Sequence, residues 1–244
     1  MKRAVRQKKY QYVADTIRQR ITTGAYPART LLPDQNALAT EFGVSRITIK
    51  KALDGIAREG LIYKKSGLGT YVLGETTLRD RDDSPANAFD GLSKQQGAER
   101  VSSQVIKFEV TFPNTMVQEQ LALTAHDPVY EIERLRLLDD APFILEHTFL
   151  PLRLVPDLAP EILMGSLYTF LHTELHLTFG GAYRSIHADM PNQLDVTYLN
   201  ASATTPILET EQLIWLTNGQ NIEYSTARNV YDKRSYTVLD VNEA

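Results

Sequence analysis

The 244-residue chain contains no cysteine, which excludes disulfide bonds, thiol catalysis and cysteine metal sites. No stretch approaches the roughly 18 consecutive apolar residues of a membrane span. The N-terminal sequence MKRAVRQKKYQY lacks the apolar core of a signal peptide, and we therefore expect a cytoplasmic protein. The chain also lacks a glycine-rich phosphate loop and a nucleophile elbow, and we expect neither a cofactor nor a catalytic centre. His172 and His176 flank Glu174 at a spacing that differs from the zincin motif, which favours a surface helix without metal.

Charge is distributed unevenly along the chain, although the net formal charge is only −4. Residues 1–74 carry 14 Lys and Arg against 5 Asp and Glu, whereas residues 75–244 carry 12 against 25. The basic segment can replace counterions on a polyphosphate, and the acidic remainder cannot. A solvated basic surface is the ordinary alternative. Here the basic positions coincide with a helix-turn-helix pattern, which favours DNA binding.

Residues 31–72 carry the pattern of a winged helix-turn-helix. A first short helix is predicted to end at Gly43, and Ser45 can cap a second one. The apolar stripes are Leu38, Ala39 and Phe42 in the first helix, and Ile49, Leu53 and Ile56 in the second. The second helix also carries a polar and basic face that suits the major groove, with Ile47 as its only apolar residue; this face comprises Arg46, Thr48, Lys50 and Lys51. A further helix is predicted over residues 9–23.

Two short strands, residues 61–65 and 70–73, are predicted after these helices, around Gly67 and Gly69. They form the wing: the glycines let the backbone approach a groove closely, and Lys64 and Lys65 can contact phosphates. An ordinary β-turn is the alternative for the glycine pair. We predict a DNA-binding domain over residues 1–74, a linker over 75–87 that is polar and contains Pro85, and a second domain over 88–244.

The second domain contains an internal duplication with an offset of 78 residues. Pro113-Asn114 recurs as Pro191-Asn192, and PVYEIE at residues 128–133 recurs as PILETE at 206–211. Each half is predicted as strand, helix, strand, turn and strand: residues 101–112, 116–123, 129–138 and 143–150, then 183–190, 194–199, 207–217 and 222–231, with a last strand over 236–241. Antiparallel hairpins with helices indicate an α+β domain. Chance similarity between strands is the weaker alternative.

Arg134 and Arg136 break the duplication, because Gln212 and Ile214 stand at their equivalent positions. Residues two apart on a strand share one face, so both guanidiniums should project together among apolar neighbours. A buried charge requires a counter-charge, which either a carboxylate of the protein or a ligand anion can supply. Two convergent guanidiniums suit phosphate or carboxylate, which favours a ligand.

Three further positions extend this candidate site. Ser166 is a natural helix N-cap, and the helix that it opens can also offer backbone N–H groups to an anion. Glu146 and Glu223 each follow an apolar segment just after a hairpin turn and would suit sugar hydroxyls or an amine. Exposed strand ends are the ordinary alternative for both glutamates.

These motifs together resemble the GntR family of bacterial transcription regulators, specifically its HutC-like branch. The segments that carry the resemblance are LATEFGVSRITIKKAL, REGLIYKKSGLGTYV, YEIERLRL, SLYTFL and IEYSTARNVY. The effector module of that branch is called UTRA and looks like the chorismate lyase fold. The resemblance implies a homodimer that binds a palindromic double-stranded DNA operator and leaves it when a small effector, often a sugar phosphate, occupies the C-terminal domain.

The resemblance also implies roles for individual residues. It places Arg46 and Lys50 at DNA-contacting positions of the recognition helix and Gly69 at the wing tip. It places Arg134, Arg136, Ser166 and Tyr168 at the effector's phosphate, and Glu146 and Glu223 at its polar body. The chain departs from the family where Asn36 replaces an arginine that commonly contacts DNA, where Lys50 and Lys51 replace arginines, and where NAFDG at residues 87–91 replaces the usual serine or threonine helix start.

We therefore interpret the chain as a repressor that an anionic effector, most simply a sugar phosphate, releases from DNA. A regulator that responds to a carboxylate such as an amino acid or urocanate is the first alternative, because Arg-x-Arg does not distinguish the two anions. An enzyme of the chorismate lyase type fused to a DNA-binding head is the second, although no acid–base pair is evident. An architectural DNA binder is the third, and it leaves Arg134 and Arg136 unexplained.

Overall fold

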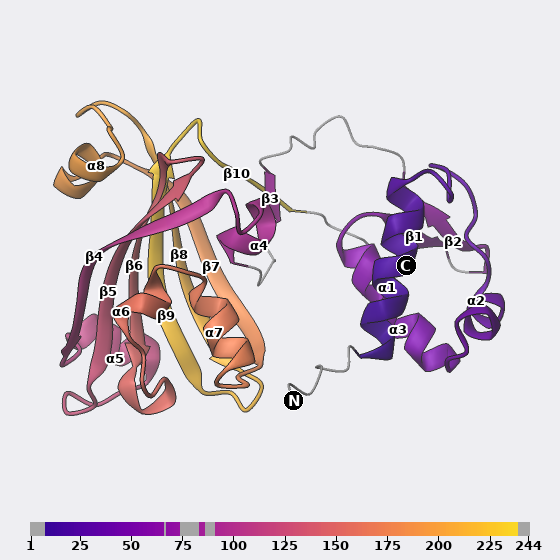
Figure 1. Ribbon diagram of the computed structural model, residues 1–244, viewed down its shortest axis with the longest axis horizontal. Helices are drawn as coiled ribbons and strands as arrows, with labels where there is room; N and C mark the ends of the chain where they lie inside the picture. The colour runs from indigo at the N-terminus through magenta and orange to yellow at the C-terminus, as the bar shows by residue number, and fades with distance from the viewer. Residues whose placement is uncertain (1–7, 66, 74–82, 86–90, 239–244) are drawn as a thin grey trace. The chain divides into compact units, whose positions relative to one another are not determined.

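The computed structural model describes residues 8–65, 67–73, 83–85 and 91–238 (Figure 1). The chain divides into two compact units, residues 1–81 with 237–244, and residues 82–236. A helical unit with a small hairpin and a unit built on an antiparallel sheet confirm the α+β class. The predicted boundaries at residues 74 and 88 fall outside the described residues and stay predictions.

The N-terminal unit is a three-helix cluster with a β-hairpin. Its elements are α1 (Lys9–Thr22), α2 (Gln35–Phe42), α3 (Arg46–Arg58), β1 (Ile62–Lys65) and β2 (Gly69–Val72), and the two strands pair antiparallel. Asp34 caps α2 by accepting hydrogen bonds from the backbone N–H groups of Asn36 and Ala37. Gly43 ends α2 in the left-handed conformation, at φ 60°, as the sequence predicts.

Apolar side chains from all of these elements except the exposed helix faces meet in one core. Leu38 of α2 and the stripe of α3 contact α1 and both strands, so that the hairpin is fixed to the helices from below the wing tip. The fully enclosed members of this core are Val13, Ile17, Leu38, Ile49, Ala52, Ile56 and Ile62. Packing of the apolar stripes therefore determines which face of α3 remains exposed.

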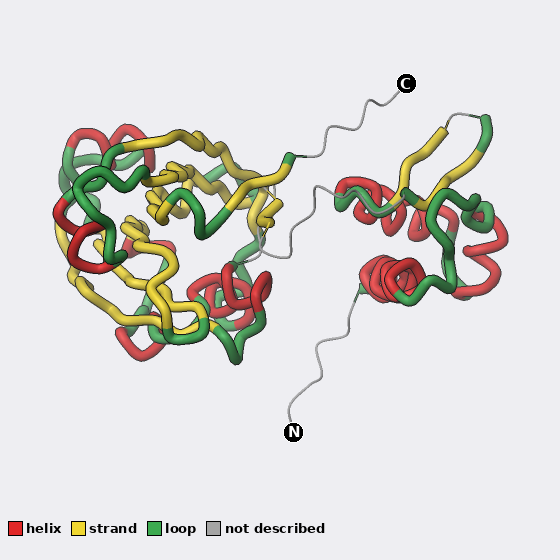
Figure 2. Tube along the Cα trace, turned by 90° about the horizontal axis from the view of Figure 1, so that it is seen from above, coloured by secondary structure: helices red, strands yellow, loops and turns green. Residues whose placement is uncertain are grey.

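The second unit contains a six-stranded antiparallel sheet in the order β4-β5-β6-β9-β8-β7 (Figure 1). Its strands are β4 (Val101–Thr111), β5 (Val129–Leu138), β6 (Ala141–Pro151), β7 (Phe179–Asp189), β8 (Ile207–Leu216) and β9 (Asn221–Val230). The strands trace a curved layer when seen from above (Figure 2). Curvature of this kind follows from strand twist and creates a concave face that can hold a ligand.

The predicted duplication is visible in this strand order. β4 and β5 begin 78 residues before β7 and β8, and α5 (Thr115–Leu121) and α8 (Gln193–Tyr198) each follow an asparagine N-cap. The two halves join where β6 pairs with β9, in a register that matches Leu145 with Arg228 and Phe149 with Tyr224. The sheet is therefore related to itself by a pseudo-two-fold axis between β6 and β9, which makes Phe149 and Arg228 equivalent positions.

Helices cover the two faces of the sheet differently. The short helices α6 (Pro160–Leu163) and α7 (Leu167–Thr173) pack their leucines onto Tyr130 and Ile132 of β5. α5 packs Val117 and Leu121 onto the opposite face, against Phe149. The face under α6 and α7 is the one that carries Arg134 and Arg136.

Some elements differ from the sequence-based prediction. A short helix α4 (Leu92–Gln96), together with α6 and a 3-10 turn η1 (Leu152–Leu154), lies in segments for which no element was predicted. Strand β10 (Ser235–Thr237) is shorter than the predicted strand over residues 236–241, of which residues 239–241 lie outside the described part. β10 pairs with β3 (Asp83–Pro85), a strand inside the predicted linker, so backbone hydrogen bonding rather than apolar periodicity defines this element.

Candidate DNA-binding surface and effector pocket

The first candidate site is the exposed face of α3. Ser45 caps this helix, with its Oγ 3.2 Å from the backbone N of Thr48. Arg46, Lys50 and Lys51 are exposed, and Thr48 is half-buried. The predicted reading face is thus presented to solvent while the apolar stripe holds the helix in the core.

Two of the predicted basic contacts have partners within the protein. Lys64 of the wing forms an ion pair with Asp54 of α3. Lys51 places its Nζ 4.4 Å from the centroid of the Tyr10 ring, at cation–π distance. These side chains tie the wing and α1 to the recognition helix, so part of their charge already stabilises the fold. Lys65 is exposed.

A hollow between the start of α2, the start of α3 and the wing gathers three residues that the sequence predicts for DNA contact: Asn36, Arg46 and Gly69. Gly69 has φ 109°, and a Cβ there would lie 2.7 Å from Cδ1 of Leu31. Only glycine fits this backbone without displacing Leu31. Gly67 also has positive φ, at 71°, but its surroundings are open. Ser66 lies outside the described residues.

Ile47 is a surface feature that the sequence argument left as an exception. Its side chain is 80% exposed, next to Arg46 in the first turn of α3. A large exposed apolar side chain on a DNA-reading face can contact the methyl group of thymine. The signal in the sequence was its place outside the apolar stripe of α3.

The second candidate site is a cavity of about 110 Å³ on the concave face of the sheet, between the sheet, α4 and α7. That volume is several times the roughly 15 Å³ that one water requires, so a small molecule fits. The cavity brings together all six predicted effector residues: Arg134, Arg136, Glu146, Ser166, Tyr168 and Glu223. They come from β5, β6, β9 and the start of α7.

Arg134 and Arg136 share one carboxylate. Arg134 donates to Glu146 at 2.6 Å and to the backbone oxygen of Leu163 at 3.1 Å, and Arg136 lies 3.5 Å from the other oxygen of Glu146. Burial alone would raise the pKa of Glu146, but the two guanidiniums outweigh it and hold this pKa below its usual value. The protein thus supplies one negative charge for two buried positive ones, and the cluster keeps a net charge of about +1.

Glu223 belongs to a second hydrogen-bonded group in the same cavity. Its Oε1 accepts hydrogen bonds from Tyr168 Oη at 3.0 Å, Gln212 Nε2 at 2.8 Å and Ser225 Oγ at 2.7 Å. Burial nevertheless raises the pKa of Glu223 above the usual carboxyl value. Burial and the proximity of Glu223 also raise the pKa of Tyr168, which keeps its hydroxyl as a donor.

Helix α4 closes the cavity beside Arg136. Ser93 Oγ accepts a hydrogen bond from Arg136 at 3.1 Å, and a Cβ on Gly91 would lie 3.7 Å from Ser166 Oγ. Ser166 itself caps α7 by accepting from the backbone N of Thr169, as predicted. The sequence argument did not identify Ser93, although it lies just after NAFDG, of which only Gly91 is described.

Several buried polar atoms around the cavity have no hydrogen-bond partner within the described part of the chain. They are Nε of Arg134, Nε of Arg136, Oε2 of Glu223 and Oγ1 of Thr210. Buried polar groups are usually satisfied, so these atoms indicate a site whose hydrogen bonding is incomplete. Both donors and acceptors are present, which suits a ligand with an anionic end and hydroxyl groups.

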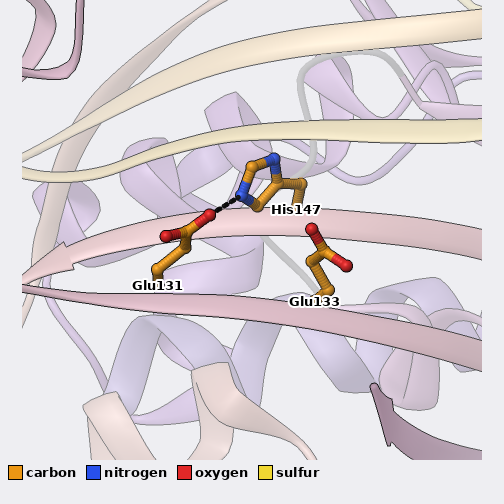
Figure 3. A group of neighbouring side chains, drawn as sticks. All are labelled: Glu131, Glu133 and His147. Atoms are coloured by element: carbon orange, nitrogen blue, oxygen red, sulfur yellow. Dashed lines mark hydrogen bonds and ion pairs between the residues drawn. The ribbon is translucent and has the colours of Figure 1, made fainter. Parts of the chain in front are cut away.

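The opposite face of the sheet carries Glu131, Glu133 and His147, with possible ligand atoms within 4.8 Å of one another (Figure 3). Glu131 binds His147 Nε2 at 2.9 Å through one oxygen and Lys107 Nζ at 2.9 Å through the other. Its charge is therefore answered by a lysine of β4. We interpret the group as an ion-pair network on the sheet surface rather than as a metal site.

Comparison with known proteins matches residues 9–72 to the gntR family of bacterial regulatory proteins and residues 95–234 to the UTRA domain. The chain belongs to the GntR family. Within this family its UTRA domain fits the HutC-like branch that the sequence resembles. It is a transcriptional regulator with a DNA-binding domain and an effector-binding domain, and not an enzyme.

Relatives align over nearly the whole chain. The sequence is 35% identical over 234 residues to the transcriptional regulator GmuR of Bacillus subtilis, covering 96% of this chain and 98% of that protein. It is 33% identical over 227 residues to the mannosyl-D-glycerate transport/metabolism system repressor MngR of Escherichia coli, covering 93% and 92%. The crystal structure of the possible transcriptional regulator YydK of Bacillus subtilis matches with a TM-score of 0.80 at 26% identity, covering 96% of this chain and all of that one.

Within the described residues, no helix is both long and apolar enough to cross a membrane.

Proposed function

We propose that this GntR-family regulator is a cytoplasmic, homodimeric repressor that leaves a palindromic operator when a phosphorylated sugar occupies the cavity of its UTRA domain. The observation that carries the proposal is the cluster of Arg134, Arg136 and Glu146, which keeps about one uncompensated positive charge beside unsatisfied guanidinium N–H groups. A phosphate offers the negative charge and the acceptors that this cluster lacks.

The remainder of the cavity suits the sugar. Glu223 and Gln212 offer a carboxyl and an amide, and Thr210 offers a hydroxyl without a partner, all of which pair well with sugar hydroxyls. MngR, one of the relatives, is named for a system that handles a mannosyl sugar acid. This name supports a sugar-derived effector for the present chain.

DNA binding is proposed to use the exposed face of α3 and the wing. Arg46, Thr48 and Lys50 would enter the major groove with Ile47, and Gly69 would let the wing approach the adjacent backbone. In a homodimer two such faces meet half-sites about 34 Å apart. The effector can release the DNA only if it binds the released state more tightly than the DNA-bound state.

The test combines operator selection with ligand binding. Duplexes selected from a random pool by the full chain define the operator, and thermal unfolding is then followed with hexose 6-phosphates, the unphosphorylated hexoses and carboxylates such as urocanate. The proposal predicts stabilisation by a hexose 6-phosphate, and loss of the selected operator on its addition. Stabilisation by the carboxylates alone would instead establish the carboxylate-responsive alternative, to which the arginine pair is also suited.

A further inference from the structure

The effector cavity contains a second pair of arginines, Arg184 and Arg234, that the sequence analysis did not identify. Both line the cavity with Arg134 and Arg136. Arg184 belongs to the edge strand β7, whereas Arg134 belongs to β5 on the other side of β6, β9 and β8. Four strand spacings of about 4.8 Å separate these strands along the sheet. The cavity therefore has arginines at two ends.

Neutral side chains orient the second pair. Arg184 Nε donates to Gln212 Oε1 at 3.0 Å, and Gln212 in turn donates to Glu223. Arg234 donates to Gln95 Oε1 of α4 at 3.3 Å, and its guanidinium carbon lies 4.6 Å from the centroid of the Tyr236 ring. Amide oxygens and an aromatic face fix a guanidinium in place without removing its charge.

Arg184 and Arg234 also interact with each other. Burial lowers the pKa of Arg234, the positive charge of Arg184 lowers it further, and Tyr236 and Glu146 oppose this effect. Two like charges that converge in a cavity repel one another, and an anion between them relieves the repulsion. Planar guanidiniums bind carboxylate and phosphate through paired hydrogen bonds.

We propose that the cavity binds a ligand with two acidic groups, a phosphate at Arg134 and Arg136 and a carboxylate at Arg184 and Arg234. The ligand class is thus a phosphorylated sugar acid rather than a neutral sugar phosphate. This inference rests on the proposed function, because it assigns the first pair to the phosphate. A carboxylate of the chain itself between Arg184 and Arg234 is the alternative, and it would leave no gain from a second acid on the ligand.

The test uses the full chain and isothermal titration with four probes: 6-phosphogluconate, glucose 6-phosphate, fructose 1,6-bisphosphate and gluconate. Wild type should bind 6-phosphogluconate at least about tenfold more tightly than glucose 6-phosphate, since one charge-assisted contact is added. In Arg184→Gln this preference should disappear, while the affinity for glucose 6-phosphate changes by less than about twofold. Arg153→Gln, a change at an exposed arginine outside the cavity, should retain the preference.

Each outcome decides the inference. Equal wild-type affinities for 6-phosphogluconate and glucose 6-phosphate, or a preference that survives in Arg184→Gln, would overturn it while leaving the proposed function intact. Tighter binding of fructose 1,6-bisphosphate than of 6-phosphogluconate would replace the carboxylate by a second phosphate and so overturn the class named here. No binding of any phosphorylated probe would refute the proposed function and this inference together. If Arg184→Gln does not fold, Arg234→Gln serves the same comparison.

Discussion

Replacement of Arg134 by alanine separates the effector response from DNA binding. The substitution removes the hydrogen bonds from this guanidinium to Glu146 at 2.6 Å, to the Leu163 oxygen at 3.1 Å and to the Gly165 oxygen at 3.5 Å. Glu146 then keeps only Arg136, at 3.5 Å. Breaking one side of a buried ion pair costs about 3 to 5 kcal/mol, and the remaining guanidinium favours the lower value.

The expected loss of stability can be stated as a melting temperature. About 3 kcal/mol corresponds to a decrease of roughly 6 to 12 °C for a chain of this size. Effector affinity should decrease at least about 100-fold, because two charge-assisted hydrogen bonds to the phosphate are lost. Operator affinity without effector should not change, since Arg134 belongs to the UTRA domain and α3 to the N-terminal one.

The assay is a fluorescence anisotropy titration of labelled operator at a temperature at which the variant is folded, with Arg153→Ala as the matched control. Arg134→Ala should stay on the DNA at effector concentrations that release wild type and the control. Release of Arg134→Ala at the wild-type effector concentration would refute the role assigned to this arginine. Loss of operator binding by the folded variant in the absence of effector would refute the separation of the two sites.

Three other predictions concern DNA affinity, the duplicated sheet and pH. Arg46→Ala should weaken operator binding by about 1 to 3 kcal/mol in a titration at matched salt, and an unchanged curve would remove Arg46 from the interface. Asp195→Val should destabilise the chain by about 3 to 5 kcal/mol in urea unfolding, because it leaves the buried Arg228 guanidinium without its bidentate partner. Adding Arg228→Phe copies the valine and phenylalanine that occupy the equivalent positions of the first half, and should recover at least about 1 kcal/mol; strictly additive losses would contradict the equivalence. Because burial raises the pKa of Glu223, its contribution to stability is present below the usual carboxyl pKa and is lost as pH rises through the raised value. Wild type should therefore lose stability relative to Glu223→Gln over that range in urea unfolding, and parallel pH profiles would show that this carboxyl does not titrate as described.

The regular part of the fold could be predicted from the sequence. The 78-residue offset predicted equivalent halves, and β5 has the predicted bounds, Val129–Leu138. Alternation and turn residues suffice there, because strand pairing follows the apolar pattern. The strand β3 and the helix α4 could not be predicted in this way, since β3 is defined by its pairing with β10 and α4 is only five residues long.

The candidate site could be predicted only in part, because its charges are satisfied across distant segments. The sequence indicated that Arg134 and Arg136 require an anion, but not that Glu146 supplies one negative charge to both. It gave no indication that Arg228 binds Asp195, although the two replace an apolar pair of the first half. Arg184 and Arg234 were also missed, since β7 and the segment after β9 converge only in the folded domain.

The central claim is that ligand in the UTRA cavity controls the hold of the N-terminal domain on DNA. It is tested most directly by one measurement, the operator affinity of wild-type full chain with and without a saturating phosphorylated sugar that binds the cavity. The account predicts at least about a fivefold weaker operator affinity in the presence of that ligand, which corresponds to a coupling free energy of about 1 kcal/mol or more. Equal operator affinities with the cavity occupied and empty would contradict it.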